Sequence, residues 1–141
     1  MFDTVVYTDY SGKSDRISYY AVKKCRYTGN EYFDNCGTKN VSSEYRRRPT
    51  DGELNAVRRA LRKFPGAIIK TDCMYAVREM AYSGHVVEHV KGHVGIAGNE
   101  HADYLAKYGR LHPNYDVICV SDHRVSSFEI LSNIQKRNPG S

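Results

Sequence analysis

The hydrophobic pattern of this chain changes its period once, at Pro49-Thr50-Asp51-Gly52. Before this break, β-branched and aromatic residues favour three strands with turn residues between them, over 3–8, 17–27 and 31–38. After it, apolar residues recur at helical spacing from Glu53, with Thr50 or Asp51 as candidate cap and Pro65-Gly66 as the end. The break therefore predicts an antiparallel three-stranded meander followed by a helix.

Strands and helices alternate through the rest of the chain. The pattern predicts, in order, a strand over 67–71, a helix from Met74 that stops at Ser83-Gly84, a strand over 86–90, a glycine-containing loop, a helix over 100–108, a strand over 114–120 and a helix over 126–136. Parallel crossovers added to a meander give a mixed sheet. We therefore expect one α/β domain over 1–141, built on a five-stranded mixed sheet flanked by helices.

The composition favours a polyanionic partner and argues against a membrane span. The chain has 141 residues, a formal net charge of +5 and an isoelectric point near 9.0. Its basic residues cluster at Arg46, Arg47 and Arg48, and again at Arg58, Arg59, Arg62 and Lys63. No apolar run approaches the ~20 residues that cross a bilayer, and the first residues do not resemble a signal peptide. These features predict a cytoplasmic protein that contacts no membrane.

The four cysteines show neither metal-site nor redox-motif spacing. Cys25, Cys36, Cys73 and Cys119 contain no C-x-x-C pair. Because no secretion signal is recognised, we expect free thiols in a reducing compartment.

Two aspartates follow apolar strands at positions where sites form in α/β sheets. Asp9 follows V-V-Y-T and Asp72 follows A-I-I-K-T. Either alone is typical of an Asx turn or a helix cap. Together with Glu53 and Asp103 they predict an all-oxygen site, which suits Mg²⁺ or Mn²⁺ and not Zn²⁺. Two such ions can stabilise the attacking and leaving oxygens of a phosphodiester displacement.

These residues stand in motifs that resemble type 1 ribonuclease H and the related domains of reverse transcriptases, over about residues 4–108. The matching stretches are V-V-Y-T-D-Y-S-G at Asp9, D-G-E-L-N-A-V-R-R-A-L at Glu53, I-I-K-T-D-C-M-Y-A-V at Asp72, and K-G-H-V-G-I-A-G-N-E-H-A-D-Y-L-A at His93 and Asp103. The ordered set Asp, Glu, Asp, His, Asp is more specific than any one member. Residues 110–141 have no match and are expected to be a C-terminal extension.

The resemblance implies a ribonuclease H-like fold and hydrolysis of the RNA strand of RNA–DNA hybrids to 3′-hydroxyl and 5′-phosphate ends. It implies that Asp9, Glu53, Asp72 and Asp103 hold two Mg²⁺ or Mn²⁺ ions, with Asp9 bridging them. His93 would lie on a mobile loop and assist proton transfer or product release. The expected nucleic-acid contacts are Ser11, Arg46, Arg47, Arg48 and Lys91.

The chain departs from the family pattern in ways that leave its substrate range open. Tyr10 stands in place of a glycine, Met74 in place of a polar residue, and R-R-R-P-T-D-G lacks the asparagines expected before Glu53. Only 20 residues separate Asp72 from His93, too few for the basic protrusion of many relatives. A tethering domain or partner protein could replace that protrusion. The alternatives are a catalytically silent nucleic-acid-binding domain and a nuclease for a broader range of double-stranded substrates.

Overall fold

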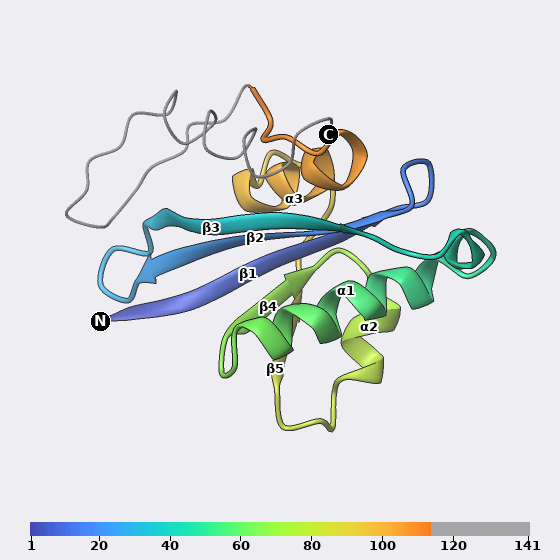
Figure 1. The fold of residues 1–141 in the computed structure, drawn as a ribbon. Helices are drawn as coiled ribbons and strands as arrows, with labels where there is room; N and C mark the ends of the chain where they lie inside the picture. The colour runs from blue at the N-terminus through green and yellow to red at the C-terminus, as the bar shows by residue number, and fades with distance from the viewer. Residues whose placement is uncertain (114–141) are drawn as a thin grey trace.

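Helices cover both faces of a five-stranded mixed sheet in the computed structural model, which describes residues 1–113 (Figure 1). The elements are, in chain order, β1 (Phe2–Ser11), β2 (Arg16–Cys25), β3 (Glu31–Asn40), the 3-10 helix η1 (Ser43–Arg47), α1 (Pro49–Lys63), β4 (Ile68–Thr71), α2 (Met74–Glu79), β5 (Val86–His89) and α3 (Ala97–Tyr108). The strands lie in the order β3-β2-β1-β4-β5. Strands β1, β2 and β3 are antiparallel, and β1, β4 and β5 are parallel. The predicted fold class is confirmed.

The central strand β1 is buried on both faces and divides the core into two layers. Val5 and Tyr7 point to the face covered by α3, where Ala102 and Leu105 pack on them. Val6 points to the opposite face, which α1 and α2 cover (Figure 1). This alternation follows from the period of two in an extended strand. Strand β1 is therefore covered on both sides, as central strands of α/β sheets are.

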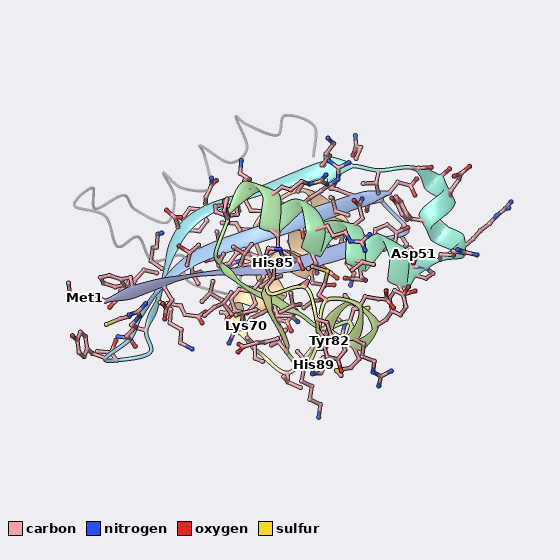
Figure 2. All side chains as sticks on the ribbon, turned by 90° about the horizontal axis from the view of Figure 1, so that it is seen from below. Met1, Asp51, Lys70, Tyr82, His85 and His89 are labelled. Atoms are coloured by element: carbon pink, nitrogen blue, oxygen red, sulfur yellow. The ribbon has the colours of Figure 1, made fainter. Side chains whose placement is uncertain are left out.

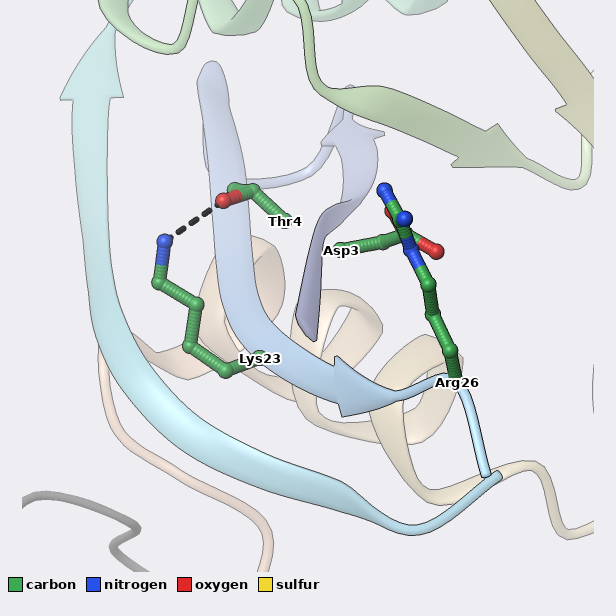
Figure 3. A network of polar contacts seen from close by, with 4 residues as sticks. All are labelled: Asp3, Thr4, Lys23 and Arg26. Carbon is green, nitrogen blue, oxygen red and sulfur yellow. Dashed lines mark hydrogen bonds and ion pairs between the residues drawn. The ribbon is translucent and has the colours of Figure 1, made fainter. Parts of the chain in front are cut away.

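Polar contacts hold the β1–β2 register at one end of the sheet (Figure 3). Thr4 pairs with Lys23 across the two strands, and Lys23 Nζ donates to Thr4 Oγ1 at 2.6 Å. Arg26, just beyond β2, donates to Asp3 Oδ1 through Nε at 3.0 Å and through a terminal nitrogen at 2.8 Å. These contacts lie at the start of β1, and Asp9 lies near its other end.

Some helix boundaries differ from those predicted, whereas the start of α2 at Met74 and the end of α3 at Tyr108 agree with the prediction. Helix α1 starts at Pro49, and Thr50 and Asp51 lie inside its first turn, so the predicted cap is wrong. The fixed φ of proline and its missing N–H favour the first helical position. Helix α2 spans six residues only, and Ser83 Oγ donates to the Met80 carbonyl at 2.7 Å just after it.

Some predictions fall on residues outside the described part of the chain. The strand over 114–120, the helix over 126–136 and Cys119 belong to this group. Among residues 1–113, Cys25, Cys36 and Cys73 form no disulfide with one another. Within residues 1–113, no helix has the length and apolar character that a membrane span requires.

Candidate metal centre

Asp9 and Asp72 reach the same edge of the sheet through neighbouring parallel strands. The prediction that Asp9 follows a strand is corrected, because β1 continues to Ser11 and Asp9 pairs with Ser18 of β2. On the other side of β1, the last pair with β4 is Tyr7 with Lys70. Continuing this register by two residues brings Asp9 opposite Asp72. The end of the β1–β4 ladder, and not the end of β1, therefore opens space for the two carboxylates.

Glu53 approaches these aspartates because α1 packs tightly on β1 near its first turn. A Cβ atom at Gly52 would lie 2.7 Å from Cγ of Tyr10, closer than any side chain tolerates. Tyr10 directly follows Asp9, and Glu53 directly follows Gly52. The contact between the Tyr10 ring and the Gly52 backbone thus holds the two acidic residues near each other. Tyr10, noted in the sequence as a departure from the family pattern, is a packing partner of α1.

Three of the four predicted metal ligands meet in one cluster, and the fourth adjoins it. Carboxylate oxygens of Asp9, Glu53 and Asp72 lie within 4.8 Å of one another. Asp103 of α3 interacts with Asp9 by a hydrogen bond and with Asp72 through its charge. Asp103 Oδ2 also lies 3.1 Å from Lys107 Nζ, one turn later on the helix. Two strands and two helices therefore each bring one carboxylate to this point.

The carboxylates resist ionisation in the absence of a cation. Burial raises the pKa of Asp9 well above its usual value, and the nearby Glu53 and Asp72 charges raise it further. Burial, with the Asp72 charge as a smaller contribution, raises the pKa of Glu53 from 4.5 to about 8, against the lowering effect of its hydrogen bond with Asp9. The pKa of Asp72 is raised by burial and by Asp103. A bound cation would remove this electrostatic cost.

The donor set fits a hard divalent cation. The cluster consists of carboxylate oxygens, which Mg²⁺ and Mn²⁺ prefer. Oε2 of Glu53 is buried and has no hydrogen-bond partner in the described part of the chain. A buried acceptor without a partner is costly, and a coordinated cation would satisfy it. These residues therefore could hold Mg²⁺ or Mn²⁺.

His93 lies beside a second acidic group that includes a residue the sequence analysis missed. Ligand atoms of His93, Glu100 and Asp103 lie within 4.8 Å of one another, next to the first cluster through Asp103. Glu100 and Asp103 are three residues apart on α3, and this spacing puts two side chains on one helix face. The spacing in N-E-H-A-D was the available signal. His93 is exposed and has a left-handed backbone, with φ of 57°.

The loop that carries His93 packs against Asp72. A Cβ atom at Gly92 would lie 2.9 Å from Asp72 Oδ2. Gly92, the residue before His93, therefore lets the loop backbone lie close to the Asp72 carboxylate. This role adds to the conformational freedom that the glycines give the loop. The charge of His93 lowers the pKa of Asp72, against the larger raising effects of burial and Asp103.

The predicted nucleic-acid contacts border the cluster, and not all of them are free to bind phosphate. Arg46 forms two hydrogen bonds with Asp15, at 2.8 and 2.5 Å, and Arg48 lies 3.7 Å from Asp51. Arg47 and Lys91 are exposed, whereas Ser11 is buried at the end of β1. A depression of about 620 Å³ runs from Glu53 to Arg46 and Lys13. Lys13 was missed because it lies in a turn without a recognisable motif.

Comparison with protein-family models and with curated proteins found no match for this chain. The functional assignment therefore depends on the fold and on the arrangement of the carboxylates.

Proposed function

We propose that this protein is a divalent-metal-dependent endoribonuclease of the ribonuclease H type, which hydrolyses the RNA strand of RNA–DNA hybrids. The observation that carries the proposal is the convergence of Asp9, Glu53 and Asp72 within 4.8 Å, with Asp103 alongside. The raised pKa values of Asp9, Glu53 and Asp72 and the buried, unsatisfied Glu53 Oε2 are expected of a site that binds cations. The mixed sheet and the order of these residues along the chain agree with the resemblance.

The four carboxylates would hold two Mg²⁺ or Mn²⁺ ions. Asp9 interacts with Glu53, Asp72 and Asp103, which favours it as the ligand shared by both ions. Bound ions would supply positive charge that stabilises the attacking and leaving oxygens during phosphodiester hydrolysis, yielding 3′-hydroxyl and 5′-phosphate ends. The strand and helix positions of the ligands hold their oxygens in place before substrate arrives.

His93 is suited to proton transfer at the edge of the centre. It is exposed, follows a glycine, and lies within reach of Glu100 and Asp103. An imidazole has two ring nitrogens, through which it can act as a general acid or a general base. Glu100 would orient the His93 ring by accepting a hydrogen bond when the loop lies against α3.

Basic residues around the depression favour a nucleic-acid substrate. Lys13 and Arg46 line it together with Glu53, and Arg47 and Arg48 follow Arg46 in the chain, at the end of η1 and at the N-cap of α1. Arg46 and Arg48 already contact Asp15 and Asp51, so Lys13 and the exposed Arg47 are the cations of this group that suit contacts with phosphates. Phosphate contacts favour recognition of duplex shape over sequence. Since R-R-R-P-T-D-G before Glu53 lacks the asparagines that the resemblance leads one to expect, cleavage of other double-stranded substrates is the second candidate.

The test is cleavage of a labelled RNA–DNA hybrid in the presence of Mg²⁺ or Mn²⁺. We expect cleavage by the wild type and loss of at least about a hundredfold in Asp72→Asn, which keeps the shape but removes a ligand charge. The matched control is Asp34→Asn, an equal charge change at an exposed position of β3, and it should retain wild-type cleavage. Double-stranded RNA and DNA assayed in parallel define the substrate range.

The outcomes separate the candidate functions. Cleavage of the hybrid alone supports the proposal as stated, and equal cleavage of double-stranded RNA supports the broader nuclease. Binding of the hybrid without cleavage under any divalent ion would contradict the proposal and assign the chain to the silent nucleic-acid-binding domains.

A further inference from the structure

A groove separates α1 from β3, on the face of the sheet that carries α1. Helix α1 packs over β1, β2 and β4, and the nearby part of β3 extends beyond it (Figure 2). The space between them has a volume of about 490 Å³. Its walls are the Asn35–Lys39 segment of β3 and the flank of α1 that carries Ala56, Arg59, Ala60 and Lys63. This volume lies within the range of ligand-binding sites.

Small residues line both walls of the groove, and the aromatic ring of Tyr19 lies between them. Ala56 and Ala60 are four residues apart on α1, so they leave a continuous hollow along one flank of the helix. On the strand side, Gly37 lies directly against the Tyr19 ring, since a Cβ there would be 2.7 Å from a ring carbon. Phe64 packs edge-on against Tyr19 at 5.4 Å between ring centroids, which holds the ring in place.

The rim of the groove is positively charged. Arg59 and Lys63 rise from α1, Lys39 lies on the opposite wall, and no acidic residue is among the lining residues. Lys63 Nζ lies 5.4 Å from the centre of the Tyr19 ring, and Arg59 Nε donates to Asn55 Oδ1. Across the described residues, neither Arg59 nor Lys63 forms an ion pair with a carboxylate. Their charges remain available to an anionic ligand.

We propose that this groove binds a single nucleic-acid strand, with its phosphates on Arg59, Lys63 and Lys39. A positively charged groove that tracks the backbone is one of the features by which proteins bind single strands without sequence preference, and this groove carries three cations and no carboxylate along its walls. The groove begins about one helical turn beyond Glu53, so it is separate from the carboxylate centre. It gives a role to Arg59 and Lys63, two members of the second basic cluster of the sequence, which the proposed nuclease reaction does not use.

The test is binding of a fluorescein-labelled oligothymidylate, measured by anisotropy in EDTA so that no cleavage contributes. Substituting the groove cations, Arg59→Gln with Lys63→Gln, should weaken binding roughly tenfold and lower the slope of log affinity against log salt by about 1.4, or 0.7 for each lost phosphate contact. Lys39→Gln, on the opposite wall, should weaken binding in the same direction. Melting temperatures of all variants establish that they are folded.

The matched control is Arg58→Gln with Arg62→Gln, which makes the same charge change on the same two turns of α1 outside the groove. We expect this control to change the affinity less than twofold. If both double variants weaken oligonucleotide binding equally, binding depends on the general surface charge and not on the groove, and the proposal is overturned. The proposal is also overturned if polyglutamate binds more tightly than the oligonucleotide and its binding depends on Arg59 and Lys63. That result would assign the groove to acidic proteins. The binding assay contains no metal ion. Its result therefore does not depend on whether the protein cleaves the RNA–DNA hybrid.

Discussion

Glu53 links the stability of the protein to the chemistry of its site. It lies on the sheet-facing side of α1, and its carboxylate has two acidic neighbours and one oxygen without a hydrogen-bond partner in the described structure. Its pKa of about 8 means that the metal-free protein holds a proton there near neutral pH. Burial of the Glu53 carboxylate destabilises the ionised, metal-free protein. The same burial strengthens the attraction between the ionised carboxylate and a bound cation.

The raised pKa of Glu53 predicts how stability depends on pH without metal. The folded state binds this proton more tightly than the unfolded chain does. Protonation of Glu53 therefore contributes fully to the stability of the folded state below pH 4.5, and this contribution is lost as the pH rises through about 8. The melting temperature in EDTA should therefore fall between pH 5 and pH 9, and Mg²⁺ or Mn²⁺ should restore it at the upper end. Glu53→Gln should be more stable than the wild type in EDTA at pH 9, on the order of 2 kcal/mol, and gain little from metal. A wild-type and variant pair with identical pH profiles would contradict this account.

Tyr10 and Gly52 form a pair in which a large and a small residue fit each other. Gly52→Ala should destabilise the protein by about 1–3 kcal/mol, because its Cβ would overlap the Tyr10 ring. Gly12→Ala is the control, since a Cβ there would be no closer than 3.4 Å to Tyr10. In a Tyr10→Ala background the cost of Gly52→Ala should largely vanish, which denaturant unfolding of the four proteins measures as a coupling energy. Additive effects of the two substitutions would show that the contact does not position α1.

At the scale of elements, the loop between β5 and α3 is coupled to Asp72 through Gly92. Gly92→Ala would place a methyl group 2.9 Å from Asp72 Oδ2 and displace that oxygen from the cluster. We expect hybrid cleavage to fall by about ten- to a hundredfold, since displacing a reacting group by a fraction of an ångström has effects of this size. The melting temperature should change little, because Gly92 lies on a surface loop.

Val94→Ala is the control for the loop, because Val94 lies on the same loop and is half-exposed. It should cleave the hybrid at nearly the wild-type rate. A fully active Gly92→Ala variant would show that the close approach of the loop to Asp72 has no part in catalysis.

The elements that could be predicted are those with a clear hydrophobic period. The meander over β1, β2 and β3 and the apolar face of α1 carry such a pattern, and all five strands of the sheet were found. Boundaries were less predictable, because they depend on single backbone groups. Helix α1 starts at Pro49 and α3 at Ala97, both earlier than predicted, and α2 is only six residues long.

At the scale of the whole molecule, the candidate site combines features that sequence can and cannot reveal. Asp9, Glu53, Asp72 and Asp103 were predicted as a set from their motifs, and the structure brings them together. The β1–β4 register and the fit of Tyr10 to Gly52 were not predicted, because each depends on a contact between segments far apart in the chain. Glu100 was also missed, although its three-residue spacing from Asp103 was a local signal for it.

The basic charge is also organised at this scale. One group of basic residues, Lys13 and Arg46–Arg48, borders the carboxylates, and a second lies along α1 and β3. A net charge of +5 therefore accompanies a locally acidic centre. This arrangement suits a polyanion that meets bound cations at the centre and side-chain cations around it.

The central claim is that Asp9, Glu53, Asp72 and Asp103 form one divalent-cation centre. The most direct measurement is the anomalous difference density of crystals grown with Mn²⁺ near pH 8. The account predicts two peaks about 3.5–4 Å apart, both ligated by Asp9, with the other three carboxylates completing the protein ligands. Crystals of Asp72→Asn should lose at least one peak, and those of Asp34→Asn should keep both. Absence of any peak at the four carboxylates in the wild type at saturating Mn²⁺ would contradict the account.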